Sequence, residues 1–350
     1  MGSDRQEKIN ILYHTSRYDQ KFAKWDAVGQ EVTLLAKNYG NLIFAHATPR
    51  TANLLRFVFR LPAFFEKLYC HKAFSLDKKV DLHHVFYPRL RDFRYLRYLK
   101  KPIIYTVVSE KMGYSSEEEM IREVRKMDYV KLFVVACEKD KDTLQKAGIK
   151  NVTVVMPGVN LDRFLKVPPV TTPPKNFLML TPPTSLQRFE NRGVNLILET
   201  ISRFKDLKVT FLWRDVAYKE MIELVQEKKL EEQVEIVNQL IKPEEYLAKS
   251  AGAIAVFTET EGNKAYPNSI IESLATSRPV IVSSVMPIAE IIQKNRCGVI
   301  VKPDVGGLSR GIQEYFRNYK TLAKNCQKTA MLFSEKRLLK DYQNIYQRIS

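Results

Sequence analysis

Residues 253–284 restrict the fold of this chain more than any other stretch of its sequence. Residues 253–258 form an apolar run that predicts a buried strand, and a helix is predicted to begin at Pro267. Arg278 and Pro279 end that helix, because proline cannot continue it, and residues 280–282 predict the next buried strand. Two buried strands joined by a helix are typical of a parallel sheet covered by helices.

The loop between this strand and this helix holds candidate ligand-binding residues. Glu259, Glu261 and Gly262 form an acidic turn, and Glu272 follows within the first turns of the helix. In open parallel sheets, ligands bind outside the carboxyl ends of the strands, where such loops lie. We therefore expect a binding site at this loop.

The same alternation of strands and helices extends along the chain of 350 residues. Residues 167–174, V-P-P-V-T-T-P-P, form a stiff segment that predicts a domain boundary. We expect two α/β domains, residues 1–170 and 171–332, each with a doubly wound parallel sheet, and a C-terminal helix at about 333–350 that packs back on the first domain. Strands are predicted at 9–14, 41–47, 80–86, 103–108, 132–136, 152–156, 177–181, 208–213, 234–237, 253–258 and 280–282.

The charge of the chain indicates an anionic partner. Its 56 Lys and Arg residues against 39 Asp and Glu residues give a net charge of +17. Nucleic acid, anionic lipid headgroups and phosphorylated substrates would all fit this excess. No apolar run approaches the roughly 18 residues of a membrane span, so any membrane contact would be peripheral. The 4 cysteines include no C-x-x-C pair, which is typical of reduced thiols in a cytosolic protein.

Two clusters have residues that could bind a metal ion, but a structural role fits both better. Asp140 and Asp142 have the D-x-D spacing of metal-dependent sugar transferases, yet they lie in a charged run that predicts a solvated helix start. His83 and His84 are adjacent on a predicted strand, so their side chains point to opposite faces and cannot easily ligate one ion. We expect no metal site, and a histidine in the core or a cleft.

Three segments together resemble the family-4 retaining glycosyltransferases (glycosyl transferases group 1), which have the GT-B fold of two Rossmann-like domains facing a central cleft. The sequence E-G, followed by P-N-S-I-I-E-S-L-A-T-S-R-P-V-I-V-S-S, is similar to their nucleotide-sugar site. Residues 152–164, V-T-V-V-M-P-G-V-N-L-D-R-F, resemble their interdomain segment, and residues 298–304 resemble a further motif. The resemblance covers about residues 130–308 and is weak over the first hundred residues.

The resemblance implies that Glu261 contacts the donor sugar and Glu272 the ribose of the nucleotide. These two glutamates are three positions further apart than in the family, so Glu259 is an alternative to Glu261. The N–H groups at the start of the helix would suit a diphosphate. The other residues expected to bind the donor here are Gly262, Asn263, Lys264, Ala265, Tyr266, Pro267, Asn268 and Ser269.

A second cluster is implied to bind the diphosphate. Family members carry an Arg and a Lys after the first strand of their second domain, and Arg188 and Arg192 stand at these places. Negative charge grows on the diphosphate as the sugar–phosphate bond breaks, so fixed cations would stabilise the transition state and no metal ion would be needed. The alternative interpretation is that Arg188 and Arg192 are ordinary surface arginines near the start of a helix, without a role in binding.

Two tracts of the first domain combine basic with apolar or aromatic residues and indicate an anionic membrane surface. Residues 54–68 have the spacing of an amphipathic helix, and residues 87–101 form a basic and aromatic tract. Two alternatives would give the same pattern: a helix with a solvated basic face, or a site that binds single-stranded nucleic acid. Neither tract contains a recognised nucleic-acid-binding module. The basic residues expected at the bilayer are Arg56, Arg60, Lys67, Arg89, Arg91, Arg94 and Arg97.

The sequence therefore predicts a cytoplasmic glycosyltransferase at the inner face of the membrane. It would move a sugar from a donor such as a UDP- or GDP-sugar to a lipid-linked or membrane-associated acceptor, without a cofactor. A soluble sugar phosphate or glycan is the alternative acceptor. The altered spacing of the glutamates, and Val108 where the family often has a histidine, leave a third interpretation: a nucleotide-sugar-binding protein without catalytic activity.

Overall fold

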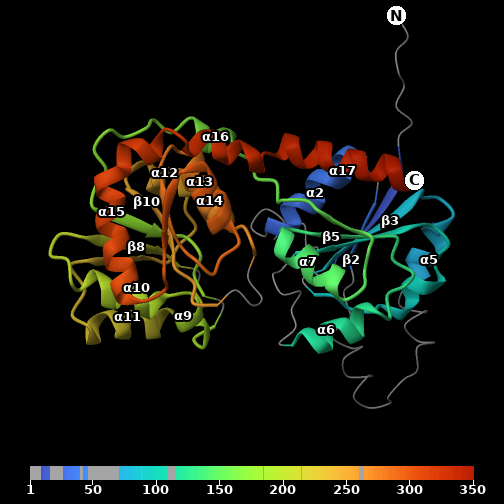
Figure 1. Cartoon of the computed structure of the whole chain (residues 1–350), viewed down its shortest axis with the longest axis horizontal. Coiled ribbons are helices and arrows are strands. Elements are labelled where there is room, and N and C mark those ends of the chain that lie inside the picture. Colours follow the sequence, from blue (N-terminus) through green and yellow to red (C-terminus); the bar gives the residue numbers. More distant parts are fainter. Residues whose placement is uncertain are drawn as a thin grey trace, which may run out of the picture. The chain divides into compact units, whose positions relative to one another are not determined.

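The chain folds into two compact units, each an open parallel sheet covered by helices (Figure 1). This architecture confirms the predicted fold class. The first unit ends at Gly158 and also contains Lys336–Ser350, whereas the second begins at Val159, so the predicted linker lies inside the second unit. The computed structural model describes residues 9–15, 27–39, 42–45, 71–87, 89–108, 116–183, 185–213, 215–259 and 264–350.

The sheet of the first unit has the strand order β2-β1-β3-β4-β5-β6, and all neighbouring strands are parallel. Its strands are β1 (Ile11–Thr15), β2 (Leu42–Ala45), β3 (Leu82–Tyr87), β4 (Ile103–Val107), β5 (Leu132–Val135) and β6 (Val152–Val154). One apolar core lies under α5 (His71–Asp77), the 3-10 helix η1 (Arg94–Tyr98), α6 (Glu117–Val124) and α7 (Glu138–Lys146). A second core lies on the other face, under α2 (Ala27–Tyr39) and α17 (Glu335–Ile349).

The sheet of the second unit has the order β12-β11-β10-β7-β8-β9. Its strands are β7 (Asn176–Met179), β8 (Lys208–Leu212), β9 (Val234–Val237), β10 (Gly252–Ala255), β11 (Val280–Ser283) and β12 (Gly298–Val301). Its helices are α8 (Asp162–Leu165), α9 (Arg188–Asn191), α10 (Val194–Ile201), α11 (Tyr218–Glu227), α12 (Pro243–Ala248), α13 (Asn268–Ala275), α14 (Ile288–Asn295), α15 (Val305–Ala323), α16 (Cys326–Ala330) and the 3-10 helix η3 (Met331–Phe333). The strand order reverses between β7 and β10, and such switch points are where open sheets bind ligands.

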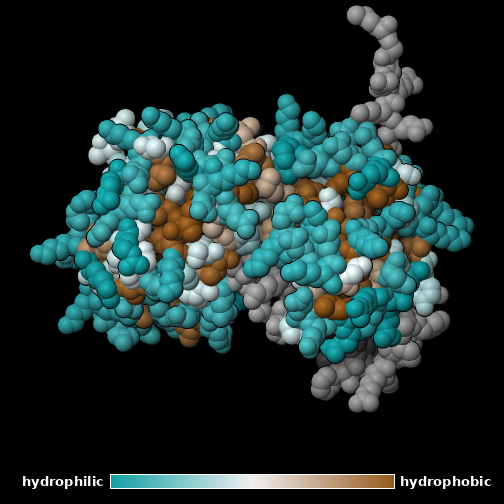
Figure 2. Space-filling model, viewed as in Figure 1, coloured by the Kyte–Doolittle hydropathy of each residue, from teal (hydrophilic) through white to brown (hydrophobic). Residues whose placement is uncertain are grey.

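The predicted strands all occur close to their predicted positions, because runs of apolar residues between polar turns mark strands that are buried on both faces. Figure 2 shows the complementary result, a surface that is mostly hydrophilic on the visible side of each unit. Among the described residues, no helix is long and apolar enough to cross a bilayer.

One expectation about local structure was wrong: Asp140 is buried in α7 rather than solvated. No group of His, Cys, Asp and Glu in the described ranges could hold a metal ion. The described residues of the basic tract 87–101 include the short helix η1, whose residues Tyr95 and Leu96 are buried. The predicted helix at 54–68, with Arg56, Arg60 and Lys67, lies outside the residues that the structure describes.

His83 and His84 are both fully buried and point to opposite faces of the first sheet, as predicted. On one face, His83 Nε2 lies 2.9 Å from Asp77 Oδ1, and its Nδ1 lies 3.0 Å from His14 Nε2. On the other face, His84 Nδ1 lies 2.8 Å from the hydroxyl of Tyr346 in α17. Burial lowers the pKa of His83, with Asp77 opposing this effect, and lowers the pKa of His84 well below its ordinary value.

These histidines predict that the first unit loses stability in mild acid. Below about pH 6.5 the unfolded histidines take up protons that the folded ones resist, so the unfolding free energy falls by up to about 1.4 kcal/mol per pH unit for each histidine. Hydrogen exchange of β1 and β3 amides between neutral pH and mild acid, corrected for intrinsic exchange rates, measures this fall. The second unit is an internal control, because its sequence contains no histidine. An equal pH dependence in both units would contradict the prediction.

Candidate functional site

The loops that follow β7 and β10 meet at the switch point of the second sheet. Gly193, at the start of α10, has a φ of 73°, and a Cβ at this position would overlap the carbonyl oxygen of Val256 just beyond β10. The backbone N–H of Thr258 donates to the carbonyl of Asn191 at 3.1 Å, and the Thr258 hydroxyl donates to the carbonyl of Glu190 at 3.2 Å. The turn at 190–193 is therefore fastened to residues 256–258.

This arrangement places Arg192 over the end of β10. Its guanidinium carbon lies 4.7 Å from the centre of the Phe257 ring, a cation–π contact with a buried aromatic residue. Arg192 Nε is buried and has no hydrogen-bond partner among the described residues. Burial, and then the neighbouring charge of Arg188, lower the pKa of Arg192 to about 10. Arg188 and Arg192 therefore repel each other, and neither forms an ion pair with a described acidic residue.

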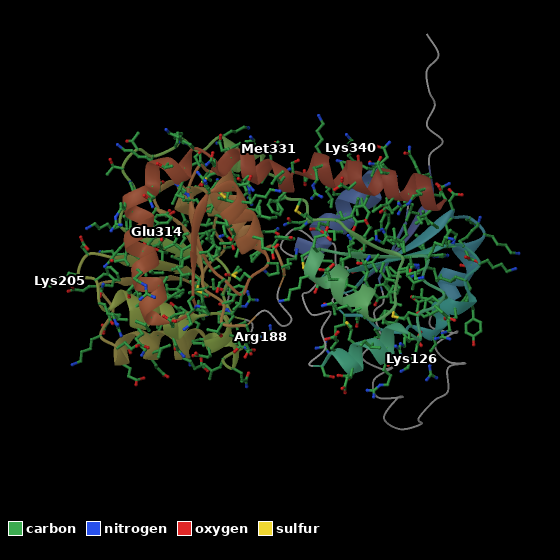
Figure 3. All side chains as sticks on the ribbon, in the orientation of Figure 1. Lys126, Arg188, Lys205, Glu314, Met331 and Lys340 are labelled. Carbon is green, nitrogen blue, oxygen red and sulfur yellow. The ribbon has the colours of Figure 1, made fainter. Side chains whose placement is uncertain are left out.

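Figure 3 shows Arg188 on a different side of the second unit from Lys205, which precedes β8. Arg188 begins α9, after the carboxyl end of β7, and is half-buried. Both arginines predicted to bind the diphosphate therefore lie at the edge of the sheet where ligands of parallel sheets bind.

The first turn of α13 offers further unpaired polar groups at this edge. Pro267 caps the helix in an extended conformation, and the first N–H to bond within the helix is that of Ile270. The N–H groups of Asn268 and Ser269 have no partner among the described residues. The Asn268 Oδ1 and Ser269 Oγ atoms are buried and likewise unpartnered in the described chain. Unpaired N–H groups and a positive helix end suit an anion.

The other predicted donor-binding residues have different surroundings. Glu272 lies one helical turn after Asn268 on the same face of α13 and is half-buried. Tyr266 is buried, with its ring 5.4 Å from that of Phe333, and Ala265 is also buried. Lys264 and Pro267 complete the described part of this loop, while Glu261, Gly262 and Asn263 lie outside the described residues.

Glu259, the alternative to Glu261, has a hydrogen-bond partner. Its Oε2 accepts a bond of 3.0 Å from Asn191 Nδ2, and its carboxylate is exposed. Asn191 and Glu259 thus extend the contact between the two loops. The sequence analysis did not find Asn191 or Phe257, because nothing in the sequence shows which residues of the two loops meet.

Thr181 is a further group that the sequence analysis missed. It follows β7, and its hydroxyl is buried without a hydrogen-bond partner in the described residues. A hydroxyl directly after a strand that borders the switch point was the available signal. With Arg192, Asn268 and Ser269, it makes a group of unsatisfied buried polar atoms on the loops of two adjacent strands. Such atoms are costly in an empty site and become useful when a polar ligand pairs with them.

Comparisons with known proteins agree with this geometry. Residues 184–318, which lie in the second unit apart from 261–263, match the sequence model of the family described as Glycosyl transferases group 1. No curated protein sequence matches the chain. The structure of Anabaena Alr3699/HepE in complex with UDP has a TM-score of 0.74 at 12% sequence identity and covers 97% of this chain and 100% of its own. The chain has the GT-B fold.

Two other GT-B structures match over nearly their whole lengths. Sucrose-phosphate synthase from Thermosynechococcus elongatus has a TM-score of 0.72 at 17% identity, covering 97% of this chain and 98% of its own. A glycosyltransferase from Rickettsia africae has a TM-score of 0.69 at 18% identity, covering 98% of this chain and 99% of its own. At these identities the likeness shows the fold alone.

Substitution of Gly193, which lies at the switch point, should lower stability more than substitution of another glycine with a positive φ. Gly193→Ala adds the strain of a left-handed backbone, about 1–2 kcal/mol, to an overlap with Val256 that costs about 1–3 kcal/mol more. Gly148→Ala is the matched control, because Gly148 also has a positive φ but an added Cβ would meet nothing within 4 Å. Calorimetric unfolding should show the larger loss for Gly193→Ala, and equal losses would contradict the close contact.

Proposed function

We propose that this protein is a retaining glycosyltransferase that uses a nucleotide-sugar donor. The observation that carries the proposal is the pair Arg188 and Arg192, whose charges no described residue neutralises. The pair follows β7, and the neighbouring strand β10 leads to the unpaired groups at the start of α13. The match of residues 184–318 to glycosyl transferases group 1 supports it. A UDP-sugar is the donor we propose, since structures of the HepE protein with the same fold contain UDP and UDP-glucose.

In this proposal the diphosphate of the donor pairs with the two arginines and with the start of α13. Asn268 and Ser269 offer N–H groups and side-chain oxygens, and Ser269 can also donate its hydroxyl proton. A diphosphate therefore accepts bonds from the N–H groups of Asn268 and Ser269 and from the buried hydroxyl of Ser269, whereas Asn268 Oδ1 can only accept and pairs with a donor group such as a hydroxyl. Glu272, one turn along the same helix face, is the proposed partner of the ribose hydroxyls.

The arginines would also contribute to the rate. When the bond between the sugar and the phosphate breaks, its electron pair stays on the phosphate oxygen, and the diphosphate gains negative charge. Fixed positive donors stabilise this state more than the bound substrate, which is the condition for catalysis. Arg192 is well suited because its stacking on Phe257 fixes the guanidinium before the donor arrives. In this mechanism the charge comes from the chain itself, without a metal ion.

We propose a lipid-linked or membrane-associated acceptor, reached from the cytoplasmic side of the membrane. The net charge of +17 supports contact with an anionic bilayer. Arg89, Arg91, Arg94 and Arg97 are all exposed around η1. Arg97 is partly committed, because it pairs with Asp92 at 3.2 Å and lies over the ring of Tyr129. A soluble sugar phosphate or glycan remains the second candidate acceptor, because phosphate groups would engage the same charges.

Substitution of Arg192 predicts opposite effects on activity and stability. Arg192→Met should lower kcat for release of UDP from the donor roughly 100- to 1000-fold, the usual effect of removing one preorganised donor. The melting temperature without ligand should stay the same or rise, since the substitution removes a partly buried cation beside a like charge.

The control for this experiment is Arg203→Met. Arg203 belongs to the same unit, but it is exposed and pairs with Glu199 at 3.6 Å on α10. Its substitution should leave UDP release unchanged. If the wild-type protein binds UDP-sugars but releases no UDP, with or without acceptors, the result favours the interpretation as a binding protein without catalytic activity. Equal kcat in both variants would contradict the role of Arg192.

A further inference from the structure

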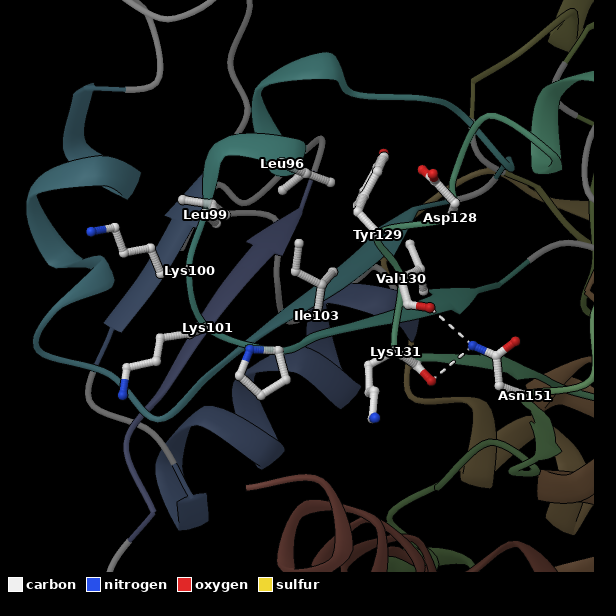
Figure 4. A pocket seen from close by; sticks show the side chains of 11 residues that line it. Leu96, Leu99, Lys100, Lys101, Ile103, Asp128, Tyr129, Val130, Lys131 and Asn151 are labelled. Carbon is white, nitrogen blue, oxygen red and sulfur yellow. Dashed lines mark hydrogen bonds between the residues drawn. The ribbon is translucent and has the colours of Figure 1, made fainter.

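The first unit has a pocket at the amino ends of its strands, on the edge opposite to the one where parallel sheets bind substrates (Figure 4). Its volume is about 560 Å³, and residues just before β4, β5 and β6 line it. Because this edge is remote from the carboxyl ends of the same strands, a ligand here would not be a reactant in the proposed sugar transfer.

The charge at the rim of this amino-edge pocket is positive. Lys100 and Lys101 come from the segment before β4, and Lys131 comes from the segment before β5. None of these lysines forms an ion pair with a described residue, and the pocket lining contains one acidic residue, Asp128. In Figure 4, the side chains of Lys101 and Lys131 extend toward the same side of the pocket, and Asp128 lies at the opposite side.

The nearby carboxylates of Asp77 and Asp92 already have other partners. Asp77 accepts bonds from His83 and from the backbone N–H groups of Lys100 and Lys101, at 3.1 and 3.3 Å for the shortest bond to each lysine. Asp92 pairs with Arg97 and accepts the hydroxyl of Tyr129 at 3.0 Å. The lysine ammonium groups are therefore left for an anion from outside the described chain.

The backbone that carries these lysines is fixed. Asn151 Nδ2 donates to the carbonyls of Val130 and Lys131, at 2.9 and 2.8 Å, and joins the segment before β6 to the one before β5. Asp77 holds the segment before β4 in the same way. Leu96, Leu99 and Ile103 add an apolar wall, of which Leu96 and Ile103 are buried. A fixed frame reduces the entropy lost when a ligand binds.

We propose that the amino-edge pocket binds the phosphate group of an organic phosphate ester, separately from the nucleotide-sugar site. Lys100, Lys101 and Lys131 pair with the phosphate oxygens, and Leu99, the accessible residue of the apolar wall, contacts the organic part of the ester. The ester is either a lipid headgroup in an anionic bilayer or a free phosphorylated metabolite, and the two sources offer the same chemistry to the pocket.

The test compares full-length wild-type protein with the double variant Lys100→Gln/Lys131→Gln. One arm measures calorimetric binding of glycerol 3-phosphate, and the other measures flotation with phosphatidylcholine vesicles that contain or lack phosphatidylglycerol. The double variant should bind about 30-fold more weakly in the arm that supplies the ligand, since each lysine contributes about a fivefold effect at a phosphate surface. Hydrogen exchange in the same arm should show protection of residues 96–103 and 128–131.

The matched control is Lys37→Gln/Lys146→Gln, which removes two exposed charges from α2 and α7 of the same unit. Binding that falls in the pocket variant but not in the control supports the site, and the responding arm identifies the source of the ester. An equal fall in both variants, or no binding in either arm, would overturn the proposal. An increase in protein stability on addition of UDP tests the nucleotide-sugar site alone. If UDP does not stabilise the protein, the proposed function fails, but the proposal for the amino-edge pocket can still be tested separately.

Discussion

The close approach of Gly193 to the carbonyl of Val256 is the constraint on which the candidate donor site depends. It lets the β7 loop lie directly on the end of β10, where only a residue without a side chain fits. The hydrogen bonds from Thr258 to the carbonyls of Glu190 and Asn191 then fix the turn at two further points. As a result, Arg192 is held against Phe257 before any ligand binds.

The second unit keeps this arrangement at a cost in stability. Arg192 is partly buried next to Arg188, and the polar atoms of Thr181, Asn268 and Ser269 lack partners among the described residues. Four of the nine buried side-chain atoms without a partner in the described residues lie on these two neighbouring loops, where a polar ligand can pair with them. The buried histidines His83 and His84 of the first unit are instead paired within the chain, with Asp77 and Tyr346.

Much of this could be predicted from the sequence, and the limits have physical causes. The bounds of β9 were predicted correctly, because apolar runs and turn residues act locally. The burial of Asp140 and the stacking of Arg192 on Phe257 were not predicted. The stacking depends on a contact between segments that are distant along the chain. The lysines of the amino-edge pocket escaped notice for the same reason, since Lys101 and Lys131 belong to different strand connections.

The central claim is that the loops after β7 and β10, with the start of α13, bind a nucleotide sugar. Hydrogen exchange of the full chain with and without UDP-glucose tests this claim most directly. The account predicts slower exchange in residues 185–196 and 264–272, with the amide groups of Asn268 and Ser269 among the most protected. Protection that is absent at saturating UDP-glucose, or confined to the first unit, would contradict it.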